Sequence, residues 1–331
     1  MHELQFLILT VIVLALLFDF INGFHDTANA IATSVSTRAI KPAHAIIMAA
    51  ALNFIGAIYS TGVAKTIGGD IVASAEMVDE HIIIAALMGS IIWNLFTWYV
   101  AMPSSSSHAL VGGIIGAVLV STGSTGLNFI GIGKIVLSLI ASPLLAIFSG
   151  FIVMTVLFLL FGQFAPSALN GRFKKMQILS AAAMAFSHGS NDAQKSMGII
   201  TLALLSGGYL SSFEVPDYVK FLCAAAMACG TALGGWRIIR TIGGKIFKLE
   251  PISGFAADLN SSIVIFSATL LHLPVSTTHV VSGSIMGVGT AKRIRAVRWG
   301  VAQQMLVAWV LTIPCTAVMG ALAYQIVLWI F

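Results

Sequence analysis

The chain has 331 residues, of which 58% are hydrophobic and only 9% charged, and its mean hydropathy is +0.98. Soluble globular chains carry about 25% charged residues, so the composition excludes that class. Many apolar runs approach the ~20 residues that cross a bilayer, which indicates a polytopic α-helical membrane protein. The net charge of +5 does not indicate nucleic-acid binding, because the basic residues lie in short loops between spans.

The apolar segments that we expect to be helical form two series. The first series covers residues 4–37, 42–64, 82–101, 103–120 and 129–162, and the second covers residues 178–206, 218–236, 254–272, 274–289 and 300–331. Polar residues interrupt the first segment of each series, so we expect a long or broken helix at the first place and a broken helix at the second. Pro143 is expected to bend the long segment at 129–162.

The first segment and the cysteines give two further expectations for this membrane protein. The first segment lacks a basic start and carries Asp19 in its apolar body, so we expect it to be retained rather than cleaved as a signal peptide. The number of cysteines, three, is odd, and they form no Cys-x-x-Cys pair. We therefore expect neither a disulfide nor a cysteine metal site.

The distribution of charge predicts a topology. Lys and Arg gather around 38–41, 172–175, 237–248 and 292–298, and the positive-inside rule places these loops in the cytoplasm. Both termini and the acidic loops then lie outside. This scheme requires the segments around Pro103 and Pro274 to form hairpins that return to their starting side. Arms near 20 residues long would also allow two full crossings, and both options stay open.

Three landmarks recur in the same order in the two halves. They are Gly23-Phe24-His25-Asp26 with Gly189-Ser190-Asn191-Asp192, Thr66-Ile67-Gly68-Gly69 with Thr241-Ile242-Gly243-Gly244, and the motifs at Pro103 and Pro274. We therefore expect an all-α membrane protein of two inverted-topology repeats with interrupted helices and re-entrant-type hairpins, which is typical of secondary transporters. The expected units are the first repeat at 1–122, a connecting span and basic loop at 123–177, the second repeat at 178–290, and a C-terminal loop and span at 291–331.

Small hydroxyl residues follow both prolines and precede an apolar, Gly-spaced helix. Free amides and the positive end of the helix dipole favour an anion at such a start. Close helix packing alone would also explain one such motif, but for two that enter from opposite faces we favour a phosphate-type site. Its candidate residues are Ser104, Ser105, Ser106, Ser107, Ser276, Thr277 and Thr278, together with Asn29.

Asp26 and Asp192 lie deep in apolar spans, where a carboxylate costs at least ~2.5–3.5 kcal/mol. A glycine three residues earlier is expected to unwind one turn and to free carbonyl oxygens, so each site suits a hard cation such as Na⁺. A role as interhelical hydrogen-bonding residues is the alternative. Further candidate Na⁺ ligands are Asn22 and Asn191, and Asp258 with Ser90 and Asn94 could form a second cation site near one boundary of the membrane.

Lys195 is a cation at membrane depth, three residues after Asp192. It either forms a buried ion pair or contacts the anion directly, and both readings stay open. Four histidines near the motifs could relay protons, although satisfying nearby backbone groups is the favoured role. They are His25, His108, His188 and His279.

Residues 23–30, 188–195 and 274–279 resemble the signatures of the inorganic phosphate transporter (PiT) family. The first reads Gly-Phe-His-Asp-Thr-Ala-Asn-Ala, the second His-Gly-Ser-Asn-Asp-Ala-Gln-Lys in a bacterial form, and the third Pro-Val-Ser-Thr-Thr-His. The resemblance implies phosphate symport with Na⁺ or H⁺ by alternating access, commonly as a homodimer. His25 replaces a usual Asn, and Asn53 and Asp258 stand where animal members carry glutamates, which leaves the ion stoichiometry open.

We therefore expect a secondary transporter in the plasma membrane that imports phosphate with Na⁺ and uses no cofactor beyond the transported cation. Proton coupling, or a sulfate or metal–phosphate substrate, is the alternative within this class. An anion channel is the alternative of another class, but it needs no cation, and the paired intramembrane carboxylates argue against it. An enzyme is not expected, because the sequence contains neither His-Glu-x-x-His nor Gly-x-Gly-Asp.

Overall fold

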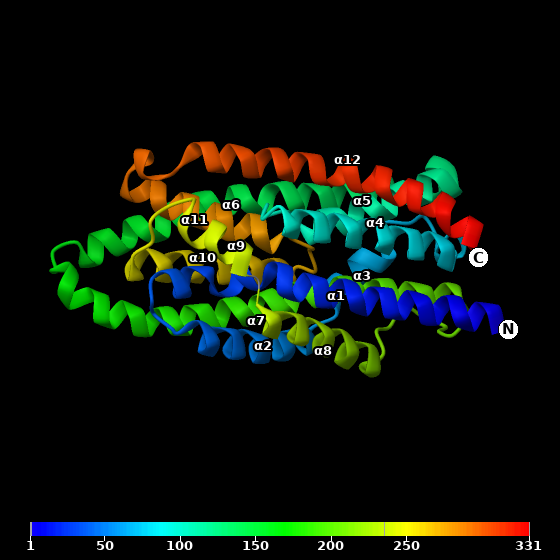
Figure 1. Cartoon of the computed structure of the whole chain (residues 1–331), viewed down its shortest axis with the longest axis horizontal. Coiled ribbons are helices and arrows are strands. Elements are labelled where there is room, and N and C mark those ends of the chain that lie inside the picture. Colours follow the sequence, from blue (N-terminus) through cyan, green and yellow to red (C-terminus); the bar gives the residue numbers. More distant parts are fainter. Residues whose placement is uncertain (1, 235, 331) are drawn as a thin grey trace.

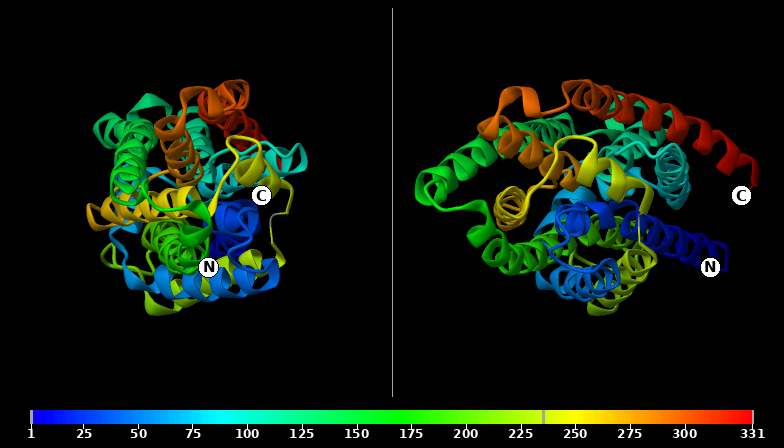
Figure 2. Two further views of the ribbon diagram at one scale, coloured as in Figure 1. Left: turned by 90° about the vertical axis from the view of Figure 1, so that its left-hand side faces the viewer. Right: turned by 60° about the vertical axis from the view of Figure 1, so that its left-hand side comes forward.

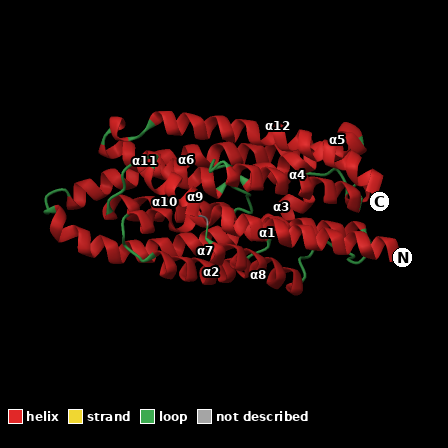
Figure 3. Cartoon of the chain, in the orientation of Figure 1, coloured by secondary structure: helices red, strands yellow, loops and turns green. Residues whose placement is uncertain are grey.

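The computed structural model describes residues 2–234 and 236–330, and over these residues the chain is a bundle of helices without a strand (Figure 3). Five helices, α1, α2, α4, α6 and α12, are long and apolar enough to cross a membrane. In the best spanning window of α6 only 17% of the residues are buried. Large apolar side chains such as Leu137 and Leu159 point outward from it, as expected for a lipid-facing helix.

The helices form two series that match in order and length. The first is α1 (His2–Ser36), α2 (Pro42–Tyr59), α3 (Gly62–Gly69), α4 (Glu80–Tyr99), α5 (Ser106–Ser121) and α6 (Phe129–Phe161). The second is α7 (Pro166–Ser206), α8 (Asp217–Leu233), α9 (Trp236–Gly244), α10 (Pro251–Leu270), α11 (Thr277–Lys292) and α12 (Trp299–Ile330). The last helices of the two series also correspond to each other. α6 has 33 residues and contains Pro143, and α12 has 32 residues and contains Pro314.

Two helical hairpins enter the bundle from opposite ends. Figure 1 shows α4–α5 entering from the end that holds both termini, and α10–α11 entering from the other end. Their tips meet inside the bundle, where the Ser107 hydroxyl donates to the Val275 carbonyl at 3.0 Å. Both hairpins therefore turn back, and the expectation of re-entrant hairpins is correct. Ala101 and His272, with φ of 56° and 59°, make the turn after the first arm of each hairpin.

The connections after α1, α6, α9 and α11 lie together at the end opposite the termini (Figure 1). They hold most of the basic residues that were expected to share one side of the membrane. Two details differ from the expectation: residues 172–175 lie within α7, and residues 236–244 form α9 rather than a loop. The side chains of Arg237 and Arg240 lie outside the described part of the structure.

The polar motifs of α1 and α7 do not break their helices, so α1 is the long helix of the two options, and the expected interruption of α7 is wrong. Both helices continue through Gly23–Asp26 and Gly189–Asp192. A Cβ at Gly23 would strike the Met227 carbonyl of α8, and one at Gly189 would strike the Asn53 carbonyl of α2. The glycines therefore permit close helix packing instead of unwinding a turn. The helical path is interrupted instead at the hairpin tips, between α4 and α5 and between α10 and α11.

The two series are interlocked rather than side by side. α1 packs against α8 and α2 against α7, while α5 packs against α12 and α11 against α6. Figures 1 and 2 place α6 and α12 along one flank of the bundle and α2 and α8 along the opposite flank. The hairpin tips and the middle of α1 and α7 are enclosed between these flanks, which places the polar motifs at the centre of the molecule.

Candidate functional site

The tips of the two hairpins are built alike. The Ser105 side chain caps α5 by accepting from the His108 amide at 3.2 Å, and Ser276 caps α11 by accepting from the His279 amide at 3.3 Å. Each helix thus begins three residues after its proline, not at the proline as expected. First-turn amides have no partner within a helix. Residues 106–107 and 277–278 therefore bring such donors, and the positive ends of two helix dipoles, to the centre of the bundle.

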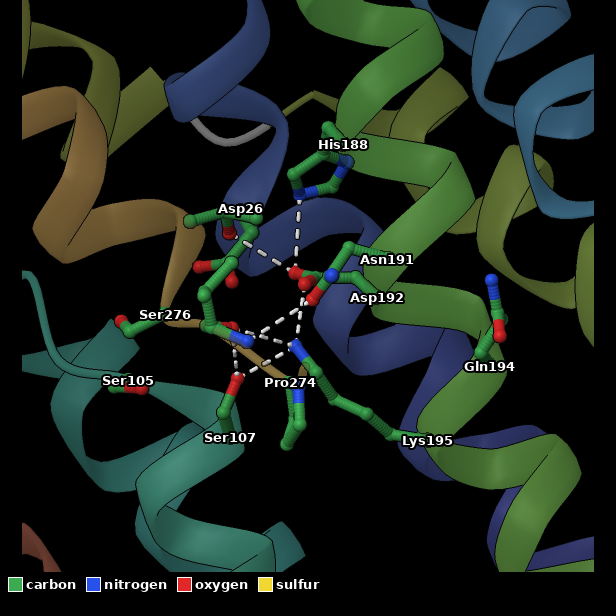
Figure 4. Close-up of polar contacts among 12 residues, drawn as sticks. Asp26, Ser105, Ser107, His188, Asn191, Asp192, Gln194, Lys195, Pro274 and Ser276 are labelled. Atoms are coloured by element: carbon green, nitrogen blue, oxygen red, sulfur yellow. Dashed lines mark hydrogen bonds and ion pairs between the residues drawn. The ribbon is translucent and has the colours of Figure 1, made fainter. Parts of the chain in front are cut away.

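Lys195 of α7 links the helix to both hairpin tips (Figure 4). Its ammonium forms an ion pair with Asp192, one turn earlier on the same helix. It also donates to the Ser107 hydroxyl at 2.5 Å and to the Val275 carbonyl at 3.2 Å. Lys195 is 0% exposed and Asp192 is 1% exposed. The ion-pair reading of Lys195 is therefore correct, and the same ammonium also faces the serine-rich tip.

The start of α11 contacts both intramembrane aspartates. Thr277 donates to Asp192 Oδ2 at 3.0 Å, and Thr278 donates to Asp26 Oδ1 at 3.3 Å. Asn29 of α1 donates to Thr278 Oγ1 at 2.9 Å and to Thr277 Oγ1 at 3.3 Å. One helix start thus touches the polar motif of each repeat.

Asn191 holds the tip segment of the second hairpin against α7 (Figure 4). Its amide nitrogen donates to the Leu273 carbonyl at 3.2 Å and to Thr269 Oγ1 at 3.1 Å, and its oxygen accepts from the Val275 amide at 3.2 Å. This side chain was expected to be a Na⁺ ligand. In the structure, its nitrogen and its oxygen both form hydrogen bonds that position the α10–α11 hairpin.

A histidine lies beside each aspartate. His25 Nδ1 is 2.7 Å from Asp26 Oδ1, and His188 Nε2 is 3.3 Å from Asp192 Oδ2. Asp26, His188 and Asp192 each offer one ligand atom within 4.8 Å of the others, a spacing that could hold a metal ion. The cluster is closed to solvent, because none of these three residues is more than 3% exposed.

Several candidate residues lie outside this cluster. Ser104 donates to Thr97 at 2.8 Å, and the Ser106 side chain has no hydrogen-bond partner. Ser90 donates to the Ala86 and Ala109 carbonyls and so joins the two arms of its own hairpin. The side chains of Asn22 and Asn94 are buried without a hydrogen-bond partner.

Asp258 forms no hydrogen bond with Ser90 or Asn94 among the described residues, and the expected second site from these three residues stays a prediction. Asp258 lies on α10, in the hairpin that enters from the other end, and its carboxylate accepts from Thr33 of α1. Thr33 follows Asp26 by seven residues on the same helix. It was not singled out from the sequence, although that spacing places it on the same face of α1.

Thr97 is a second residue that sequence reasoning missed. It contacts His25 Nε2 at 3.2 Å and accepts from Ser104. It therefore connects the first polar motif to the serine-rich tip. One threonine in an apolar run gives no signal of such a role, because the contact depends on how α4 packs against α1.

Comparison with known proteins gives consistent matches. Residues 22–320 match the model of the phosphate transporter family. The chain is 51% identical over its full length to a probable low-affinity inorganic phosphate transporter of Bacillus subtilis, aligned over 100% of that protein. It is 46% identical to a relative of the same description from Rhizobium meliloti, over 96% of each chain. A solved structure described as the sodium-dependent phosphate transporter matches with a TM-score of 0.90 at 26% identity, covering 98% of this chain and 100% of that one.

Proposed function

The chain belongs to the phosphate transporter family, and from this membership we propose that it imports inorganic phosphate by symport with Na⁺ through alternating access. The observation that carries the proposal is the meeting of two helix starts from opposite ends of the bundle around one buried ion pair. Ser107 on one side and Thr277 on the other contact the Asp192–Lys195 pair, and Thr278 beside Thr277 contacts Asp26. The two faces of this site belong to hairpins of opposite orientation, as alternating access requires.

The anion would be held by groups that the two tips supply. First-turn amides of α5 and α11 and the hydroxyls of residues 106–107 and 277–278 are donors of the kind that bind phosphate. Lys195 adds a positive charge at the same place, bonded to Ser107. Phosphate offers four oxygens in a tetrahedral arrangement, so donors that converge from two directions suit it better than donors from one face.

Charge explains why cations must enter with the anion. With Asp26, Asp192 and Lys195 in their ionised forms and with neutral histidines, the cluster would have one net negative charge. A bare phosphate would enter a buried site of its own sign, and its desolvation would add a large penalty. Bound Na⁺ at Asp26 and at Asp192 would remove the repulsion. The Oδ atoms of both aspartates, together with nearby hydroxyls, are the hard oxygen ligands that such a cation prefers.

Proton coupling is the second candidate, favoured by the histidine beside each aspartate. His25 and His188 lie 2.7 and 3.3 Å from Asp26 and Asp192. A proton shared within either pair would neutralise the carboxylate as Na⁺ does. The relative described as sodium-dependent supports Na⁺ as the first choice.

The test is uptake of labelled phosphate into proteoliposomes, with the Na⁺ and pH gradients varied independently. Uptake should accumulate phosphate against its gradient when Na⁺ is higher outside. Asp26→Asn and Asp192→Asn should each abolish it, whereas Asp217→Asn, at a carboxylate that is 85% exposed, should not. Uptake that only dissipates a phosphate gradient and ignores both cations would identify a channel and overturn the proposal.

The orientation and assembly belong to the same proposal. The basic connections at one end of the bundle support a cytoplasmic location for that end and an external location for both termini. The resemblance to the family also favours the plasma membrane and a homodimer. Labelling of cysteines introduced near each terminus by a membrane-impermeant reagent tests the orientation in intact cells.

A further inference from the structure

Asp19 is a buried carboxylate that the proposed site does not use. It lies on α1, seven residues before Asp26, and is 0% exposed. At 1.5 Å per residue the two positions are about 10 Å apart along the helix. Asp19 lies on the side of Asp26 toward the termini, because α1 begins at that end of the bundle (Figure 1). Residues 19, 22 and 26 share one face of α1, since they are spaced by three and four positions.

The surroundings of Asp19 leave polar atoms unmatched. Ser196 of α7 donates to Asp19 Oδ1 at 2.7 Å, and the Cys223 thiol of α8 also hydrogen-bonds the Asp19 side chain, while no nitrogen or oxygen donor reaches Asp19 Oδ2. Asn22, one turn along α1, is 0% exposed and neither of its side-chain polar atoms has a partner. Among the Lys, Arg and His side chains that the structure describes, which do not include Arg237 and Arg240, none forms an ion pair with Asp19. Buried polar groups are normally matched, so these atoms require an explanation.

The charge of Asp19 indicates what kind of ligand these unmatched atoms would bind. An isolated carboxylate in a dry interior is strongly unfavourable, so it either takes up a proton or binds a cation. The titratable groups near it are Asp192 and Lys195 of α7 and Cys223 of α8. Lys195 is already paired with Asp192, and the thiol is not a cation. The proton or cation must therefore come from the medium.

We propose that Asp19, Asn22 and Ser196 form a Na⁺ site separate from the sites at Asp26 and Asp192. A carboxylate, an amide oxygen and a hydroxyl from two adjacent helices are hard oxygen ligands, which suit this class of cation. Ser196 follows Asp192 by four residues on α7, so the new site lies one turn from the central cluster. A cation there would lie between the central cluster and the end of the bundle that holds the termini. The inference rests on Na⁺ symport as the proposed function.

The test counts Na⁺ ions by equilibrium binding of ²²Na⁺ to the purified full-length protein without phosphate. Asp19→Asn keeps the size of the side chain and removes its charge, and the number of Na⁺ bound per protomer should fall by one. Ser196→Ala keeps the carboxylate, so it should retain the full count and weaken one site several-fold. The matched control is Thr201→Val on α7, because this buried hydroxyl donates only to the Met197 carbonyl of its own helix.

An unchanged count in Asp19→Asn, with the variant eluting as wild type on size exclusion, would overturn the inference and assign a proton to the carboxyl group. Should Asp19→Asn fail to fold, unaltered Na⁺ affinity in Ser196→Ala would overturn it equally. The outcome is separable from that of the proposed function. Na⁺-driven phosphate uptake with an unchanged count contradicts only the Asp19 site. Loss of one ion with phosphate uptake that ignores Na⁺ contradicts only the coupling.

Discussion

Replacing Lys195 by Met should destabilise the protein strongly, because it isolates a buried carboxylate. Lys195 is 0% exposed, and its ammonium bonds Asp192, Ser107 and the Val275 carbonyl. Methionine preserves most of the apolar length and removes the charge. Breaking one partner of a buried ion pair costs about 3–5 kcal/mol. The free energy of unfolding of Lys195→Met should therefore fall by about this amount.

The chain contains a matched control for this variant. Lys220 and Asp217 form a second ion pair with the same three-residue spacing, at 2.8 Å, but their side chains are 26% and 85% exposed. Exposed pairs contribute about 0–1 kcal/mol. Lys220→Met should therefore change the free energy of unfolding by less than about 1 kcal/mol. The contrast between the two variants isolates the effect of burial from the effect of losing a lysine.

A double variant separates charge from packing. Lys195→Met with Asp192→Asn removes both charges, so most of the lost stability should return while phosphate uptake stays absent. Unfolding in detergent micelles titrated with SDS, followed by tryptophan fluorescence, measures the stability. The reasoning is wrong if Lys195→Met loses no more stability than Lys220→Met, or if the double variant is no more stable than the single one.

Further variants test the packing and polar contacts of the site. Gly189→Ala should lose about 1–3 kcal/mol of stability in the same unfolding assay, because its Cβ would strike the Asn53 carbonyl. Gly171→Ala on the same helix has open space and should gain up to about 1 kcal/mol. Asn191→Ala removes three hydrogen bonds to the second hairpin and should reduce phosphate uptake at least tenfold with the protein still inserted. Thr278→Val should raise the Na⁺ concentration for half-maximal uptake, and Thr278→Ser should restore it, since only the hydroxyl contacts Asp26.

The architecture was predictable because the membrane allows few solutions. Backbone groups in lipid must be satisfied within helices, so apolar runs and their charged ends locate the helices, although they do not decide whether a hairpin arm crosses the bilayer fully. The repeated landmarks then fixed the inverted arrangement, and the prediction of opposed hairpins is confirmed by the contact between Ser107 and Val275. Asp26 and Asp192 stood out for the same reason, since a carboxylate at membrane depth is rare.

The parts that were not predictable depend on contacts between distant segments. A glycine beside a carboxylate is compatible with an unwound turn and with close packing, and only the position of α8 or α2 decides between them. The serines of the first tip look equivalent in sequence, yet Ser105 caps a helix while Ser107 bonds Lys195. Asp258 meets Thr33 because α10 crosses α1, which no local spacing reveals. The roles of the candidate phosphate and Na⁺ ligands stay predictions.

The two hairpin tips are held with unequal strength, which predicts which end of the bundle opens first. The α11 tip is tied to α1 and α7 through Thr277, Thr278 and the Val275 amide. The α5 tip is tied to α7 through Ser107 and Lys195, and to the α11 tip through the Val275 carbonyl.

Each buried hydrogen bond contributes about 0.5–1.5 kcal/mol, so the α4–α5 hairpin should move away at lower cost and expose the site toward the termini. A cysteine replacing Ser106, in a chain without its three native cysteines, should then react with an impermeant thiol reagent added from that side. The reaction should be slower when Na⁺ and phosphate are both present, because the bound ions tie the two tips together. Equal labelling of a cysteine at Thr277 from the opposite side would show that neither hairpin is favoured, since the starts of α5 and α11 occupy corresponding positions in the two repeats.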